Sequence, residues 1–337
     1  MSLIGVPMQL APVFGPVIGG AIVDQVSWRW IFFVNLPIAV AAIVLAWRLL
    51  PEAAPRLGRR LDVLGLALLA PGIAIFVYGM SQASAAGGFR GPRTLTGVVL
   101  GLALVAAFAW HAWRRGDASL LDIRLFARRG FAAAAGTNLL VGIALFGALI
   151  LLPLYFQLVR GETPLATGLL LVPQGLGAAV ALPVAGRLTD EIGARVVIPF
   201  GVLLALAGMA VYTQVDTETS YWLLGASLFV IGLGLGTTIV PSMAVAYQAV
   251  PREAVAHATS TINPIQRIAG SVGTALLAVI LQRSISTGRA HTPSALAAAF
   301  GTTFWVAFGL VAAALVPALL LPRLRPRRQE QAAPVAS

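Results

Sequence analysis

The chain has 337 residues, of which 58% are hydrophobic and 10% are charged, and its mean hydropathy is +0.89. Soluble domains carry about 25% charged residues, so this depletion, with repeated apolar runs of about 20 residues, excludes an ordinary soluble domain and predicts a polytopic helical membrane protein. The net charge of +11 comes from 23 basic residues that are all arginine, and the absence of lysine excludes a Walker A loop.

Ten apolar spans are predicted in chain order from the spacing of charges, glycine and proline. They cover residues 1–23, 30–50, 63–83, 94–113, 131–156, 165–187, 196–213, 221–249, 255–283 and 296–322. An even number of spans places both ends of the chain on the same side of the membrane.

The first two spans contain the most informative residues. Residues 15–20 read GPVIGG and residues 28–37 read WRWIFFVNLP. Gly15, Gly19 and Gly20 fall on nearly one helix face, which allows two membrane helices to approach closely. Pro16 removes one backbone donor and bends the helix.

The GPVIGG stretch resembles motif C of drug:proton antiporters in the major facilitator superfamily. The WRWIFFVNLP stretch resembles the start of the next helix in the fourteen-helix EmrB/QacA-type branch. In that branch four helices precede motif C, and here none does, so we expect an all-α, incomplete major facilitator fold that lacks the first four helices.

The resemblance covers nearly the whole chain and implies its division into four parts. Residues 1–50 are the last two helices of the N-terminal half, 51–130 an inserted helix pair with arginine-rich loops at 51–62 and 114–130, 131–322 a six-helix C-terminal half, and 323–337 a tail. The arginines concentrate in those two loops and the tail, which predicts a cell-membrane protein with both termini in the cytoplasm. The same distribution argues against a nucleic-acid partner.

Residues 186–195, GRLTDEIGAR, resemble motif A in its second-half position. Gly186 permits a close helix approach, and Asp190 is expected at the start of the next helix, where it would interact with the helix dipole and an arginine. The resemblance implies a cytoplasmic gate; its residues are Gly186, Arg187, Asp190, Gly193 and Arg195. Glu191 and Ala194 depart from the basic residues usual in the family, and the alternative is a capped turn without gating.

The span 165–187 resembles the family helix that packs against the motif C helix. Its small residues Gly168, Gly175 and Gly177 are candidates for that interface. We expect Gly15 and Gly19 to pack near Gly175 and Gly177. Ordinary glycine packing between membrane helices is the alternative.

Polar side chains inside the spans are costly in hydrocarbon unless they face the bundle or water. The candidates for a cavity of mixed polar and aromatic character are Asn138, Tyr155, Gln157, Gln174, Asn263 and Arg267. For each one the alternative is a single interhelical hydrogen bond worth under about 1 kcal/mol. Arg267 lies roughly 15 Å deep in its span, and we expect its counter-charge to come from outside the spans of this chain, unless it snorkels or binds carbonyls freed by Pro264.

Reactive groups are scarce. The chain has no cysteine, and its three histidines, His111, His257 and His291, belong to different segments, so we expect them in loops or helix interfaces. We therefore predict no catalytic residues, no metal site and no cofactor.

The family implies export of small amphipathic molecules in exchange for protons, by rocking of two halves. We predict multidrug efflux from a truncated transporter whose partners are a small-molecule substrate, protons and the lipid bilayer. The alternatives are a dedicated metabolite or self-resistance exporter, and a non-transporting membrane remnant or scaffold. Neither the substrate nor the oligomeric state follows from the sequence.

Overall fold

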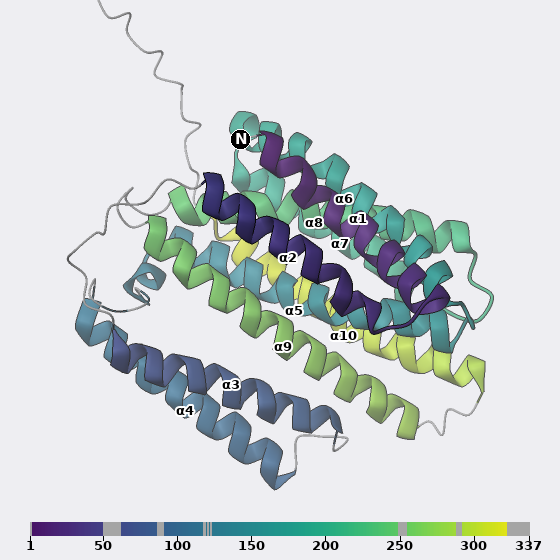
Figure 1. Cartoon of the computed structure of the whole chain (residues 1–337), viewed down its shortest axis with the longest axis horizontal. Helices are drawn as coiled ribbons and strands as arrows, with labels where there is room; N and C mark the ends of the chain where they lie inside the picture. The colour runs from purple at the N-terminus through teal and green to yellow at the C-terminus, as the bar shows by residue number, and fades with distance from the viewer. Residues whose placement is uncertain are drawn as a thin grey trace, which may run out of the picture.

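The computed structural model describes the backbone of residues 2–49, 62–85, 91–116, 119, 121, 123–248, 255–287 and 292–321, and the side chains in these ranges except those of 2–13, 83–85, 248, 255–264 and 287. The helices are α1 (Ser2–Gln25), α2 (Trp30–Leu49), α3 (Val63–Ala85), α4 (Pro92–Arg115), the short 3-10 helix η2 (Ile123–Ala127), α5 (Arg129–Leu158), α6 (Pro164–Ile192), α7 (Ala194–Tyr212), α8 (Tyr221–Gln248), α9 (Val255–Thr287) and α10 (Pro293–Leu319). Figure 1 shows their arrangement.

The expected fold class is confirmed over the described part of the chain, which is helical and contains no β-strand. Each predicted span coincides with one helix. The largest difference is in α6, which continues to Ile192 instead of ending at residue 187. Among the described residues nine helices, α2 to α10, are long and apolar enough to cross a membrane.

Helices α5 to α10 share one apolar core. Its largest fully buried side chains include Tyr155 and Phe156 on α5, Tyr212 on α7, and Phe300 and Phe304 on α10. The rings of Tyr155 and Phe300 lie 5.9 Å apart, and those of Tyr212 and Phe304 lie 5.2 Å apart, at separations typical of favourable aromatic pairs. The six helices therefore form one packed unit.

Glycines on α8 bring two neighbouring helices close to its backbone. A side chain at Gly232 or Gly236 would collide with α6 beside Ala178, and one at Gly234 would collide with α7 beside Ala205. Small residues allow this kind of approach between membrane helices. As a result α6 and α7 each pack extensively on α8, and they contact each other much less.

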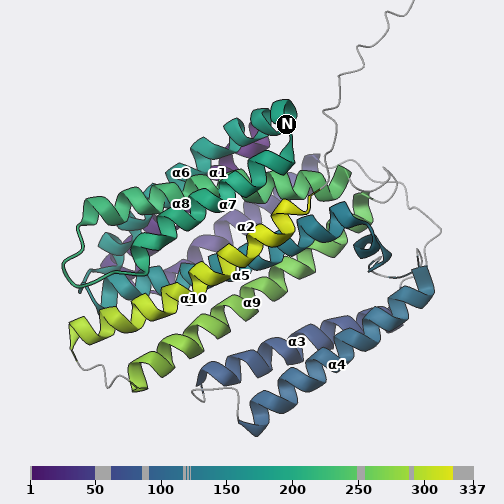
Figure 2. The same ribbon diagram turned by 180° about the vertical axis from the view of Figure 1, so that it is seen from behind.

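Helices α3 and α4 form a separate hairpin beside α9 (Figures 1 and 2). Gly79 of α3 and Gly97 of α4 face each other across a backbone-to-backbone contact. A small apolar cluster, which includes Leu69, Phe108 and Ala112, lies between the helices. The hairpin meets the six-helix unit mainly through α3 and α9.

Helix α2 is the least packed element. None of its residues is buried, and Trp47 keeps 89% of its surface exposed. Its main contacts among the described helices are with α1. Helix α1 itself packs along α6, so the connection of these two helices to the rest of the protein is chiefly the contact between α1 and α6.

Candidate functional site

The contact between α1 and α6 is made by glycine against backbone. A side chain on Gly20 of α1 would stand against the carbonyl group of Pro164, the first residue of α6. One turn away, a side chain on Gly168 of α6 would meet the carbonyl of Pro16. The two helices can approach this closely only because both positions lack a Cβ atom.

The pairing of individual glycines differs from the expectation. A Cβ atom on Gly15 or Gly19 would have no described heavy atom within 4 Å, while one on Gly177 would meet Phe229 of α8. Gly175 is buried within α6. The physical reason is helical phase: Pro16 and Gly20 are one turn apart and share the face toward α6, whereas Gly15 and Gly19 lie one residue earlier and point to its side.

The motif A-like turn joins α6 to α7 without an intervening loop. Gly193 adopts a φ of +89°, donates its N–H to the Thr189 carbonyl at 3.1 Å, and is followed at once by α7. Asp190 therefore lies in the last turn of α6 and does not cap α7. Within the described residues its exposed carboxylate has no hydrogen-bond or ion-pair partner, and the expected contact with an arginine is not formed.

The candidate cavity residues on α5 are engaged locally instead of lining a common space. The Asn138 amide is buried and donates to the Ala134 carbonyl at 3.0 Å on its own helix. Tyr155 is fully buried, and its hydroxyl donates to the Asp216 carbonyl at 2.7 Å. Gln157 is exposed near the end of α5. Asn138 and Tyr155 are separated by about 25 Å of helix.

The remaining candidates also lie apart. Gln174 borders a cavity of about 20 Å³ inside the six-helix unit, whose other lining residues, such as Val141 and Met209, are apolar. The side chain of Asn263 lies outside the described residues. Arg267 on α9 is exposed, and within the described part of the chain its guanidinium has no ion-pair or hydrogen-bond partner.

A polar clasp that the sequence reading missed joins the α5–α6 and α7–α8 connections. Arg160 donates through Nη1 to the carbonyls of Thr217 and Thr219, at 2.8 and 3.0 Å, and through Nε to the Tyr221 hydroxyl at 3.2 Å. Its guanidinium stacks 4.3 Å from the centre of the Tyr221 ring. The same hydroxyl donates to Glu162. We name these residues the outer clasp, and they fix the chain that leads into Pro164.

The outer clasp favours the charged form of its arginine. Burial opposes the charge, but the hydrogen bond to Tyr221 and the attraction of Tyr221 and Tyr155 outweigh it and raise the pKa of Arg160. The Arg160 guanidinium therefore stays charged at neutral pH.

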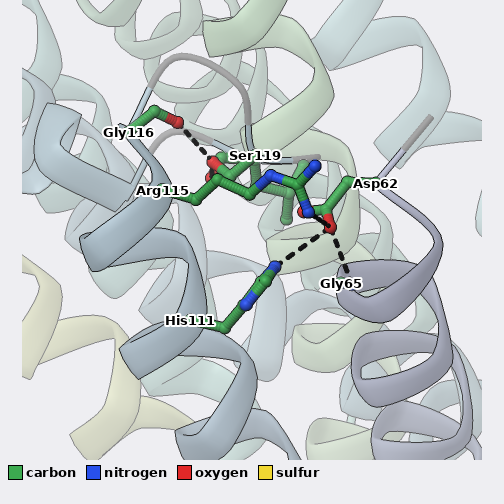
Figure 3. A network of polar contacts seen from close by, with 7 residues as sticks. Asp62, Gly65, His111, Arg115, Gly116 and Ser119 are labelled. Carbon is green, nitrogen blue, oxygen red and sulfur yellow. Dashed lines mark hydrogen bonds and ion pairs between the residues drawn. The ribbon is translucent and has the colours of Figure 1, made fainter. Parts of the chain in front are cut away.

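A second clasp, also missed, ties the start of α3 to the end of α4 (Figure 3). The Asp62 carboxylate, 2% exposed, accepts from the Gly65 N–H, from Arg115 Nη1 and, when the ring carries hydrogen there, from His111 Nε2, each at 3.0 Å. It caps α3 and neutralises a cation on α4 at once. The only sequence signal was an aspartate just before an apolar span.

Comparisons with known proteins agree with this architecture. The sequence model of the Major Facilitator Superfamily matches residues 1–274 of this chain. A multidrug resistance protein B homologue from Mycobacterium tuberculosis (strain ATCC 25618 / H37Rv) is 34% identical over 96% of this chain and 66% of its own length. The puromycin resistance protein pur8 of Streptomyces alboniger is 34% identical over 81% of this chain and 54% of its own. The lincomycin resistance protein LmrB of Listeria monocytogenes is 25% identical over 83% of this chain and 59% of its own.

Proposed function

Because the chain belongs to the Major Facilitator Superfamily, we propose that it functions in the export of small amphipathic molecules by proton antiport with alternating access. It is a multi-pass membrane transporter and not an enzyme. The chain spans 66% of the length of the Mycobacterium relative. Drug efflux is supported by the resistance proteins among its relatives, and the observation that carries the mechanism is the contact of α1 with α6.

The α1–α6 contact suits a surface that opens and closes. Gly20 and Gly168 approach backbone to backbone, so separating the helices there requires no unpacking of large side chains. On the other side, α6 is held to α8 through the α8 glycines. We infer that α1 rocks against a six-helix unit that moves as one body.

The outer clasp fixes the first turn of α6, at one end of the surface that contacts α1. It holds the connection that ends at Thr163, whose hydroxyl accepts from the Ala166 N–H at 3.2 Å and caps α6. Arginine bias supports an orientation with this end outside the cell and both termini in the cytoplasm. In the proposed orientation, the Gly20–Pro164 contact closes the interface on the external side. Reporter fusions at Asp216 should read external and fusions at Asp117 cytoplasmic; the reverse pattern would overturn the orientation.

The test of transport uses a protein as long as the relatives. We would join the chain to the segment of the Mycobacterium relative that lies outside the matched 66% of its length, which we expect to add further helices, reconstitute the joined protein in liposomes, and follow a fluorescent amphipathic cation such as ethidium together with internal pH. Substrate-dependent proton flux is expected from the joined protein. No flux from a correctly inserted joined protein would contradict the proposal and favour a membrane scaffold.

A dedicated exporter is the second candidate, because two relatives carry the name of a single drug, puromycin or lincomycin. A growth-inhibition survey of many compounds in cells producing the joined protein separates the two. Protection against several unrelated amphipathic compounds supports multidrug export. Protection against one compound supports a dedicated pump.

A further inference from the structure

An apolar furrow runs between the second half of α6 and the first half of α7. Its volume is about 570 Å³, and its lining is apolar except for one threonine: Val180, Ala181, Val184, Ala185, Leu188 and Ile192 of α6, Val196, Val197, Phe200 and Leu204 of α7, with Leu233 and Thr237 of α8 at the floor. It exists because α6 and α7 pack on different sides of α8, α6 at Gly232 and Gly236 and α7 at Gly234, and contact each other little.

The furrow faces away from α1. Pro164 and Gly168, which contact α1, lie on one face of α6. By helical periodicity Val184 and Leu188 lie on roughly the opposite face. Val184 keeps 51% of its surface exposed and Phe200 of α7 keeps 55%, so in a membrane the furrow opens toward lipid and not toward the proposed transport interface.

The length of the furrow matches one leaflet. From Val180 to Ile192 it extends about 18 Å along α6, and half of the hydrocarbon core of a bilayer is about 15 Å thick. It ends at Gly193, where the chain turns from α6 into α7. An acyl chain of that leaflet therefore fits along it from headgroup to tail.

The charged end of the same helix face selects the headgroup. Arg187 and Glu191 continue the stripe formed by Val180, Val184 and Leu188, at the i+3, i+4 and i+7 spacing of one helix face. Both charged side chains are exposed, and within the described residues neither has an ion-pair or hydrogen-bond partner. A cation and an anion one turn apart complement a headgroup that carries a phosphate and a primary ammonium.

We propose that the α6–α7 furrow binds one phospholipid with an amine-bearing zwitterionic headgroup, such as phosphatidylethanolamine. Its acyl chain lies along Val180, Val184 and Leu188, its phosphate pairs with Arg187, and its ammonium pairs with Glu191. The site depends only on the chain spanning a membrane, so its failure and the failure of the transport proposal are independent.

The test is native mass spectrometry of the purified chain, exchanged into equimolar phosphatidylethanolamine, phosphatidylcholine and phosphatidylglycerol. Retention of one phosphatidylethanolamine is expected. Val184→Trp fills the furrow and should reduce the retained fraction at least several-fold. The matched control is Val316→Trp on α10, where the valine is 63% exposed and outside the furrow, and it should retain the lipid as the unsubstituted chain does.

Headgroup recognition is tested by substituting the two exposed charged side chains, because changes at exposed positions should not disturb folding. Arg187→Gln and Glu191→Gln should each abolish the preference for phosphatidylethanolamine, while Arg48→Gln, at an exposed position on α2, should keep it. Equal retention by Val184→Trp and Val316→Trp would overturn the proposal, as would equal retention of the three lipids by the unsubstituted chain. Binding of ethidium in place of lipid, lost in Val184→Trp, would identify a substrate portal instead.

Discussion

Gly20 of α1 lies directly against the backbone carbonyl of Pro164 at the first residue of α6. The neighbouring Gly19 faces open space, with no described heavy atom within 4 Å of a Cβ placed there. Two adjacent glycines of one motif thus have different surroundings, and substitutions at the two positions separate an interface role from a general preference for small residues.

Gly20→Leu should impair efflux by the joined protein, because a side chain there would force α1 away from α6. Overpacking of this kind costs about 1–3 kcal/mol, and each 1.4 kcal/mol shifts an equilibrium by about tenfold. Gly168→Leu should act in the same direction. The measurement is ethidium efflux from liposomes, normalised to inserted protein. Gly19→Leu is the control and should be close to neutral; a larger defect there than at Gly20 would refute this contact.

Asp62→Ala should destabilise the α3–α4 hairpin by about 1–2 kcal/mol. The substitution removes the helix cap, worth about 1 kcal/mol, and an ion pair whose arginine is 38% exposed and whose contribution is therefore below about 1 kcal/mol. Asp62→Asn keeps a capping oxygen and should lose less. Thermal unfolding in detergent measures both, with Asp24→Ala on α1 as the control. Equal losses for Ala and Asn would mean that the cap contributes nothing.

The α7–α8 connection should be insensitive to pH near neutrality and should loosen only in strong acid. Hydrogen bonds from the Thr219 hydroxyl and the Glu218 N–H hold the pKa of Asp216 below its ordinary value of 3.8. Because the folded-state pKa is lowered, the stabilisation is present above 3.8 and is lost as the pH falls through the folded-state value.

Because the sequence contains no cysteine, a single fluorescent label on Ser220→Cys can report the mobility of the α7–α8 connection. Label mobility should stay constant from about pH 5 to about pH 8 and rise below the ordinary aspartate range. Asp216→Asn should give a mobile label at every pH. A transition near pH 6 in the unsubstituted connection would contradict the assignment to Asp216.

Arg267→Ala should lower transport by the joined protein more than it lowers its abundance in the membrane. An arginine deep in a span costs about 2.5–3.5 kcal/mol on insertion scales, so its removal should not hinder insertion. Its counter-charge is expected from the added helices or from an anionic substrate group. The measurements are efflux and quantitative immunoblotting, with Gln266→Ala as the neighbouring control. Efflux equal to that of the unsubstituted protein would assign Arg267 a structural role.

The helices could be predicted from the sequence because hydrocarbon thickness and the cost of unpaired backbone groups leave little choice within an apolar run. Side-chain contacts could not be predicted in the same way. The GPVIGG motif predicted a glycine interface on α1 at Gly15 and Gly19, but the phase of the helix decides that Gly20, and not Gly19, meets α6.

The contacts of the polar side chains could not be predicted from the sequence either. Asn138 and Tyr155 were candidates for a binding cavity, yet each is buried and donates to a backbone carbonyl. Conversely, Asp62 and Arg115 are 53 positions apart, and only the tertiary pairing of α3 with α4 brings them together. Sequence spacing carries no information about such a contact.

The hairpin of α3 and α4 has its own apolar cluster and its own polar clasp at Asp62, and it contacts the remaining helices mainly through α9. Under a pulling force applied from one end of the chain, two helices joined in this way would leave the bilayer together, in a single rupture event. The contacts of Asp62 would then determine the height of that force peak. Because the hairpin is held together by its own contacts, the pair could also be inserted or removed as one unit without disturbing the aromatic core of the other helices.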